Sequence, residues 1–313
     1  MIDPDRGAPA PRSILRHVLG SILTAMATPF DPDLRVDEAA TASLAAHLVE
    51  HVSDGLVMAG TTGEASTLTD DEKVALYRLA VREVGDRASV VAGTGSNDTA
   101  HSVHLTRLAA EAGVDAVLVV TPYYNRPPRA GIVGHVAAIA EVGVPVVLYN
   151  IPGRSGINLE PDLIAELAEI PNVVALKQAN PDLDECRRVA EAGTGLTLYA
   201  GNDDMLFPVV EMGGTGVISV ASHLVGDEMA AIVAAAGRGD IDEARRRDES
   251  LSGLYAGLFV TTSPILIKAA LEMTGLIPSG RLRLPLVAAT PVQRDILRTV
   301  LERQGILSRA SAS

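Results

Sequence analysis

Two apolar runs decide the fold of this chain: residues 144–149 read VPVVLY and residues 173–177 read VVALK. Neither run alternates between apolar and polar residues, as a strand with one face in water would. Short continuous runs rich in β-branched residues are typical of strands in a parallel sheet that is covered on both faces. An amphipathic segment between the two runs supplies a crossover helix. The pair therefore indicates a strand, helix and strand in succession.

The same unit recurs along most of the chain, because a short β-branched run returns every 19 to 34 residues. The runs predict eight strands: Ser21–Thr28, Gly55–Ala59, Ser89–Ala92, Ala116–Val120, Val144–Tyr149, Val173–Lys177, Thr197–Ala200 and Gly216–Val220. Eight regular units followed by purely helical sequence favour an α/β fold of the closed (β/α)8 TIM barrel type over a doubly wound open sheet.

The strand repeat stops beyond Leu224. The remaining sequence predicts helices near Asp227–Ala236, Ile241–Phe259, Pro264–Met273 and Pro291–Gln304. No linker rich in Pro, Gly or Ser marks a second domain. We therefore expect an N-terminal tail over residues 1–19, a barrel over residues 20–238, and a C-terminal helical extension over residues 239–313 that packs on the barrel.

Composition and charge exclude several classes of protein. The formal net charge of -13 opposes binding to nucleic acid, which needs a concentrated basic face. No apolar run reaches the ~20 residues of a membrane-spanning helix, and three prolines interrupt residues 1–12 where a signal peptide would be apolar. The single cysteine, Cys186, fits a reducing compartment. We expect a cytoplasmic protein without a nucleic-acid or membrane partner.

Polar residues follow the predicted strands at the points where these end. They are Thr28, residues 60–64 (GTTGE), residues 93–95 (GTG), residues 121–125 (TPYYN), Tyr149, Asn150, Lys177, residues 201–203 (GND) and Ser219. Barrel enzymes place their active sites at the C-terminal ends of the strands. If the strands close into a barrel, these residues surround one mouth and form the candidate site.

Lys177 is the most informative of them. The chain has three lysines against 23 arginines, and Lys177 ends an apolar strand. Burial there favours the neutral amine, which is the nucleophile that attacks carbonyl groups, whereas an arginine stays protonated. A lysine that merely snorkels at a strand end remains the alternative for this residue taken alone. Lys73 on a charged helix and Lys268 in a C-terminal helix need no more than ordinary surface or packing roles.

Tyr149 ends the strand that precedes the one carrying Lys177, so a phenol and an amine are expected side by side. A tyrosine in that position can shuttle the protons that formation of a Schiff base requires. Three of the six tyrosines, Tyr123, Tyr124 and Tyr149, fall at predicted strand ends. Core packing explains any single one of them, but it explains the clustering less well.

Two further features suit a substrate carboxylate. Residues 60–63 combine flexible glycines with the hydroxyls of Thr61 and Thr62, which can hold a carboxylate by hydrogen bonds, although a plain turn is the alternative. Arg154 follows Tyr149 closely, and its guanidinium can clamp a carboxylate at two points. An exposed loop arginine is the alternative.

Metal and nucleotide chemistry are not expected. The pairs His47 with His51 and His101 with His104 lack the glutamate of the zinc-protease pattern, so solvated histidines are favoured. The GTTG stretch lacks the spacing and the lysine of a nucleotide-binding loop, and the glycines of residues 213–216 precede a strand instead of following it. We therefore predict no metal and no cofactor.

The motifs GTTGE (60–64), TPYYN (121–125), YNIPGRSG (149–156) and Lys177, in this order and spacing, resemble the dihydrodipicolinate synthase family of class I pyruvate-dependent aldolases. The resemblance runs from about Gly20 to Leu301. It implies that the chain condenses pyruvate with L-aspartate 4-semialdehyde to give 4-hydroxy-tetrahydrodipicolinate, in lysine and diaminopimelate biosynthesis. It also implies a homotetramer built as a dimer of dimers.

The resemblance assigns a role to each candidate residue. Lys177 would form the Schiff base with pyruvate, Thr62 would hold the pyruvate carboxylate, and the backbone at Ile218 would line the pocket. The proton relay would consist of Thr61, Tyr149 and Tyr124, the last from a neighbouring subunit, and Arg154 would bind the carboxylate of the semialdehyde.

Two departures from the family pattern concern the residues after Lys177 and the inhibitor pocket. Residues 178–181 read QANP where the family often has an acidic residue and a turn with glycine. In lysine-inhibited members a pocket at the dimer interface uses histidine and glutamate, and the matching positions here hold Asp70, Lys73 and His101. Lys73 would repel the ammonium group of lysine, so we expect weak or absent feedback inhibition.

Two kinds of alternative function remain. N-acetylneuraminate lyase and 2-keto-3-deoxy sugar acid aldolases share the lysine, the tyrosine and the first glycine motif. Arg154 with Thr61 and Thr62 favours a short aldehyde that carries a carboxylate over a polyhydroxylated one. A non-catalytic barrel that binds a keto acid would not need a proton relay.

Overall fold

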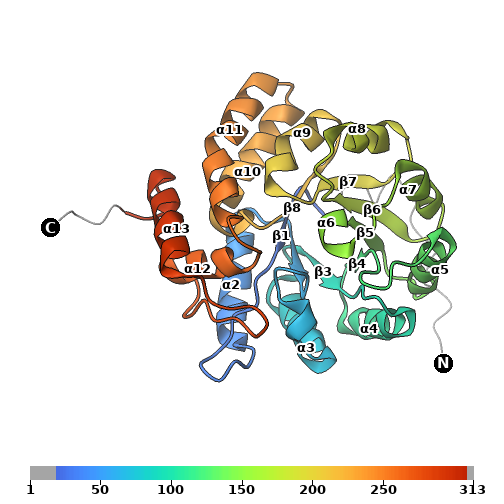
Figure 1. Cartoon of the computed structure of the whole chain (residues 1–313), viewed down its shortest axis with the longest axis horizontal. Helices are drawn as coiled ribbons and strands as arrows, with labels where there is room; N and C mark the ends of the chain where they lie inside the picture. Colours follow the sequence, from blue (N-terminus) through green and yellow to red (C-terminus); the bar gives the residue numbers. More distant parts are fainter. Residues whose placement is uncertain (1–18, 309–313) are drawn as a thin grey trace.

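Eight parallel strands close into one barrel in the computed structural model, which describes residues 19–308 (Figure 1). The strands are β1 (Ile22–Ala25), β2 (Gly55–Met58), β3 (Ser89–Gly93), β4 (Ala116–Val120), β5 (Val146–Asn150), β6 (Val173–Gln178), β7 (Thr197–Ala200) and β8 (Gly216–Ser219). Each strand pairs with the next along the chain, and β8 pairs with β1. The predicted TIM barrel is confirmed, and an open doubly wound sheet is excluded.

Two strands differ from the prediction by more than one residue at an end, and four others differ by one residue. β5 begins at Val146 and not at Val144, because Pro145 has no amide N–H for the ladder, although its carbonyl accepts from the Val117 amide at 2.8 Å. β1 ends at Ala25 and not at Thr28. The Thr28 hydroxyl instead donates to the Gly63 carbonyl at 2.8 Å, so the end of this run supports the loop after β2.

Side chains that point inward fill the barrel. Buried residues from the strands and their ends form one inner cluster: Leu23, Ala25, Val57, Val91, Ala116, Leu118, Val147, Tyr149, Ala175, Tyr199 and Ile218 are among its members. The outward side chains of the same strands pack against the surrounding helices in a second, larger cluster. Because both faces of the sheet are covered, the strands read as continuous apolar runs.

Helices surround the barrel (Figure 1). They are α2 (Glu38–Glu50), α3 (Asp70–Val84), α4 (Thr99–Ala112), α5 (Arg129–Ala140), α6 (Pro152–Ser155), α7 (Pro161–Ala168), α8 (Leu183–Glu191), α9 (Leu206–Glu211), α10 (Ser222–Gly237), α11 (Ile241–Leu258), α12 (Ile265–Met273) and α13 (Pro291–Arg303), with short 3-10 turns η1 (Ala65–Thr67) and η2 (Asp203–Met205). A capping box opens α3, since the side chains of Thr69 and Glu72 each accept from the backbone N–H of the other.

The last three helices lie together beside the barrel, and the chain between α12 and α13, drawn in red, runs past α2 toward α3 (Figure 1). Within residues 19–308, no helix is long and apolar enough to cross a membrane. The N-terminal tail expected for residues 1–19 falls, apart from Leu19, outside the described residues. The boundary expected between residues 238 and 239 stays a prediction.

Candidate active site

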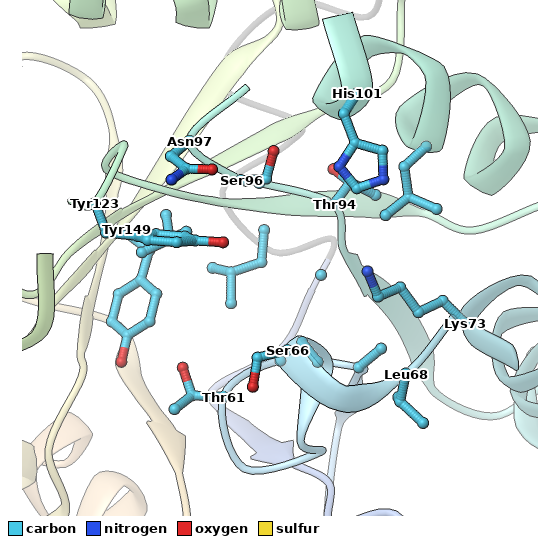
Figure 2. Close-up of a pocket in the computed structure, with 18 of the residues that line it drawn as sticks. Thr61, Ser66, Leu68, Lys73, Thr94, Ser96, Asn97, His101, Tyr123 and Tyr149 are labelled. Atoms are coloured by element: carbon cyan, nitrogen blue, oxygen red, sulfur yellow. The ribbon is translucent and has the colours of Figure 1, made fainter. Parts of the chain in front are cut away.

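The strand ends of the barrel open into a cavity of about 610 Å³. The chain that follows β2, β3, β4 and β5 lines it, and its residues include Thr61, Thr94, Tyr123, Tyr149 and Arg154. Figure 2 shows Thr61, Tyr123 and Tyr149 toward one side of the cavity and Lys73 and His101 toward the other. The cavity therefore has an inner end at the barrel mouth and an outer end between α3 and α4.

Lys177 and Tyr149 lie directly beside each other. The register pairs Tyr149 of β5 with Lys177 of β6, and the Lys177 Nζ is 4.4 Å from the centre of the Tyr149 ring. Both side chains are 5% exposed. Lys177 itself does not border the cavity, whereas Tyr149 does, so the phenol connects the cavity with the amine.

The surroundings of Lys177 favour its neutral form. Burial lowers the pKa of the amine from 10.5 to about 8, the Asp203 carboxylate opposes this shift, and the positive charge of Arg154 adds to it. A buried ammonium loses its hydration, so the proton is held less strongly than in water. At pH 8 about half of the amine is therefore unprotonated and able to attack a carbonyl carbon.

Tyr149 carries its proton at neutral pH. Burial raises the pKa of the phenol to about 12, against the opposing effects of the Arg154 charge and of a side-chain hydrogen bond with Thr61. A phenol that is protonated and bonded to a second hydroxyl can give a proton and recover it along the same path. The structure thus brings Tyr149, Thr61 and Lys177 into one group.

Thr62 and Ile218 are buried next to this group, and neither borders the cavity. Ile218 belongs to the inner cluster of the barrel together with Tyr149, and it pairs with Leu23 of β1. Thr62 follows Thr61 directly in the loop after β2. Ile218 precedes the last residue of β8, and the contacts expected for both residues with pyruvate stay predictions.

Arg154 stands at the rim of the cavity on the short helix α6. Its Nη2 donates to the Thr262 hydroxyl at 3.3 Å and to the Ser263 carbonyl at 3.4 Å. These partners precede α12, so a segment more than 100 residues away orients the guanidinium. A fixed positive charge in this position suits a substrate carboxylate.

Tyr124 is the one candidate that this single chain does not bring to the others. Its side chain is 89% exposed, and its backbone is left-handed with a φ of 72°. The neighbouring Tyr123 lines the cavity instead.

Asp203 is a member of the site to which sequence reasoning assigned no role. Its buried carboxylate accepts from the Ser219 hydroxyl at 2.6 Å, the Val220 amide at 3.0 Å and the Ala221 amide at 2.9 Å. It also supplies the negative charge that opposes the shift at Lys177. The signal for it was the polar stretch GND after the seventh strand, but the partners lie at the end of the eighth.

Of the surface or packing roles expected for Lys73 and Lys268, the surface role is wrong, because both lysines are buried. Lys73 is 9% exposed and its Nζ lies 3.5 Å from Asp70 Oδ1, while His101 Nε2 lies 2.9 Å from Asp70 Oδ2. These three residues form the outer end of the cavity. Lys268 is completely buried, and its Nζ lies 2.6 Å from Glu64 Oε1.

Comparison with known proteins places the chain among close relatives. The model of the dihydrodipicolinate synthetase family matches residues 18–304. The 4-hydroxy-tetrahydrodipicolinate synthase of Heliobacterium modesticaldum is 48% identical over 92% of this chain and 96% of that protein.

Solved structures agree with this match. The dihydrodipicolinate synthase of Cyanidioschyzon merolae with lysine bound has a TM-score of 0.90 and 41% identity, over 93% of this chain and 100% of that one. The enzyme of Acinetobacter baumannii complexed with pyruvate has a TM-score of 0.89 and 36% identity, over 93% and 100% of the two chains.

Proposed function

The chain belongs to the dihydrodipicolinate synthetase family, and from that membership we propose that it is a lyase that condenses pyruvate with L-aspartate 4-semialdehyde to 4-hydroxy-tetrahydrodipicolinate, in lysine and diaminopimelate biosynthesis. The observation that carries the proposal is the buried amine of Lys177, with a lowered pKa, beside the phenol of Tyr149. Close relatives that bear the name of this synthase support the choice of substrates.

In the proposed reaction the neutral amine of Lys177 attacks the carbonyl carbon of pyruvate. The carbonyl oxygen takes up the two protons that the amine gives up and leaves as water, so that a C=N bond replaces the C=O bond. Transfer of a methyl proton to the nitrogen then gives an enamine. The enamine carbon forms a bond with the aldehyde carbon of the second substrate, while the aldehyde oxygen takes up the proton from the nitrogen and becomes a hydroxyl. The amino group of that substrate attacks the C=N carbon, which closes the ring and releases Lys177.

The proton transfers in these steps are assigned to Tyr149 and Thr61. Each formation or collapse of the carbinolamine needs a proton delivered to oxygen or removed from nitrogen within hydrogen-bond reach. The Lys177 amine lies over the Tyr149 ring, and the Tyr149 hydroxyl is bonded to Thr61, which supports a relay from the amine outward. Thr62 and the backbone at Ile218 are assigned to the carboxylate and the body of bound pyruvate.

The third hydroxyl of the relay, that of Tyr124, is assigned to a second copy of the chain. Its exposure of 89% and left-handed backbone support insertion into a neighbouring subunit. The proposed assembly is a homotetramer formed as a dimer of dimers, and sedimentation equilibrium of the wild-type protein and of Tyr124→Ala tests it. We assign the enzyme to the cytoplasm, where its lone cysteine would stay reduced.

The choice of aldehyde rests on Arg154. The sugar-acid aldolases of the same superfamily would use the same amine on polyhydroxylated aldehydes. An arginine at the rim of the cavity favours a short aldehyde with a carboxylate, because the guanidinium and carboxylate form a paired, charge-assisted contact.

A turnover assay tests the proposal. Pyruvate is supplied with aspartate semialdehyde in one series and with sugar-derived aldehydes in another, and loss of pyruvate is followed in both. We expect turnover with the semialdehyde only, and a large loss of it in Arg154→Ala. Turnover with the sugar-derived aldehydes alone would show that these, and not aspartate semialdehyde, are the second substrate. Binding of pyruvate without turnover of any aldehyde would favour a non-catalytic barrel.

A further inference from the structure

Glu64 directly follows Thr61, Thr62 and Gly63 in the loop after β2. Its backbone is left-handed, with φ 57° and ψ 39°, a conformation that residues other than glycine rarely adopt. The Glu64 amide donates to the Thr61 carbonyl at 3.1 Å, and the Glu64 carbonyl accepts from the Thr67 amide at 2.9 Å. The conformation of Glu64 therefore determines how the two threonines are presented to the barrel mouth.

The Glu64 carboxylate is held entirely from the C-terminal part of the chain. Its Oε1 accepts from Lys268 Nζ of α12 at 2.6 Å, and its Oε2 accepts from the backbone amide of Arg283 at 3.0 Å. Neither the Lys268 nor the Glu64 side chain is exposed at all. The two donors lie 204 and 219 residues along the chain from their acceptor.

Arg283 also holds the chain at the end of η1 and in the first turn of α3. Its guanidinium donates to the Thr67 carbonyl at 2.9 Å and to both carboxylate oxygens of Glu72, at 2.6 and 2.8 Å. The Phe30 ring packs against both cations, with Lys268 Nζ at 4.2 Å and the Arg283 guanidinium carbon at 4.5 Å from its centre. The segment between α12 and α13 thus clamps residues 64–72, and it lies beside α2 and α3 in Figure 1.

We infer that Glu64, Lys268 and Arg283, the Glu64 cluster, are positioning residues that hold Thr61 and Thr62 in the geometry required for catalysis. The inference deepens the proposed function and rests on the roles given there to the two threonines. Among the described residues, the Glu64 carboxylate is hydrogen-bonded only to Lys268 of α12 and to Arg283 in the segment after α12. The C-terminal part of the chain is therefore a part of the active-site scaffold.

A stabilising role alone explains the cluster poorly. A buried ion pair loses the hydration of both ions, and replacing such a pair by apolar residues is often neutral for stability. Burial also lowers the pKa of Lys268, against the opposing Glu64 carboxylate, as expected for a cation placed in an apolar surrounding. The ion pair of Lys268 and Glu64 instead fixes the orientation of both side chains, because a charge-assisted hydrogen bond holds them in one geometry.

The test compares variants of the full-length enzyme. Glu64→Gln combined with Lys268→Met removes both charges at nearly constant volume and leaves no buried ion without a partner. Arg283→Lys keeps a positive charge and the backbone bond to Glu64, but loses the paired contact with Glu72. Arg294→Ala is the matched control, because it breaks another C-terminal ion pair, with Glu272 at 2.8 Å, that does not contact the loop.

Three quantities are measured well below the melting temperature of each variant: KM for pyruvate, kcat, and hydrogen exchange of the amides of residues 60–67 without substrate. For the double variant we expect a KM for pyruvate raised about tenfold or more, a lower kcat, and faster exchange in that segment, because an error of about 1 Å in placement can cost about a hundredfold in rate. Arg283→Lys should change the same quantities less, and Arg294→Ala should change none of them.

Wild-type values of KM and exchange in a folded double variant would overturn the inference and leave the pair a purely structural element. If the double variant does not fold, Arg283→Lys decides by the same two readouts. If the wild-type enzyme itself neither binds nor turns over pyruvate, the proposed function has failed, while the exchange of residues 60–67 still decides whether the cluster positions the loop.

Discussion

Burial lowers the pKa of Lys177 to about 8, and this makes the first chemical step depend on pH in a defined way. Only the unprotonated amine attacks pyruvate, so kcat/KM for pyruvate should fall about tenfold for each pH unit below the pKa and level off above it. A pH profile of kcat/KM, which reports the free enzyme, measures this. An inflection near 10.5, the ordinary value for lysine, would contradict the account.

Removal of the Tyr149 hydroxyl should affect the rate and not the binding of pyruvate. Tyr149→Phe is expected to lower kcat by about 10²- to 10⁴-fold, which is the usual contribution of one proton-transfer group, with little change in KM. Tyr199→Phe is the matched control, because Tyr199 also neighbours Lys177 in the sheet but bonds the Gly20 carbonyl. Equal losses of kcat in the two variants would mean that the phenol of Tyr149 acts only in packing.

At the scale of the residue, the sequence could identify the groups that we propose to act chemically, but not the residues that hold these groups in place. Lys177 was recognisable because it ends an apolar strand in a chain poor in lysine. Asp203 and Lys268 were not, since their significance arises from partners on other elements: Ser219 and the amides after it for the first, and Glu64 for the second. No local pattern encodes a contact between residues 204 positions apart.

The capping box of α13 shows an element whose stability can be changed without a change in catalysis. Thr290→Ala removes the hydroxyl that accepts from the Gln293 amide at 3.3 Å. It should reduce the free energy of unfolding by about 1 kcal/mol, as loss of an N-cap usually does, with KM for pyruvate unchanged. Urea denaturation measures the loss, and Thr290→Ser, which keeps the oxygen, should restore stability. A change in KM without a change in stability would contradict a purely capping role.

At the scale of the element, apolar runs predicted all eight strands, and the four helices expected after Leu224 are present. The larger differences in strand bounds follow from single residues. Pro145 delays the start of β5 because it cannot donate to the ladder, and the chain after Ala25 leaves the sheet to support the loop at Gly63. The sequence placed Arg154 near the site. Its hydrogen bonds to Thr262 and Ser263 could not be predicted from the sequence, because the fold alone brings these residues together.

At the scale of the whole molecule, the outer end of the cavity bears on regulation. Lys73 and His101 already pair with the Asp70 carboxylate there, at 3.5 and 2.9 Å, so an incoming ammonium group meets a cation and an occupied carboxylate. We expect weak or absent inhibition by lysine. Steady-state rates at increasing lysine measure it, and Lys73→Met should strengthen any residual inhibition. Strong inhibition of the wild type by millimolar lysine would contradict this expectation.

Closure of the barrel was predictable from the number of repeats, because eight units are what a TIM barrel needs. The way in which the C-terminal helices attach was not. We expected them to pack on the barrel, but the contacts of Lys268 and Arg283 with the loop after β2 depend on the three-dimensional arrangement alone. The number of subunits and the partner surface of Tyr124 stay predictions.

The central claim is that Lys177 forms a Schiff base with pyruvate, and chemical trapping tests it most directly. The enzyme is incubated with pyruvate and borohydride, digested, and searched by mass spectrometry for the reduced adduct, with Lys177→Arg as the control. The account predicts one adduct, on Lys177, that is absent from the control. An adduct on Lys73 or Lys268 instead, or no adduct in an enzyme that turns over pyruvate, would contradict it.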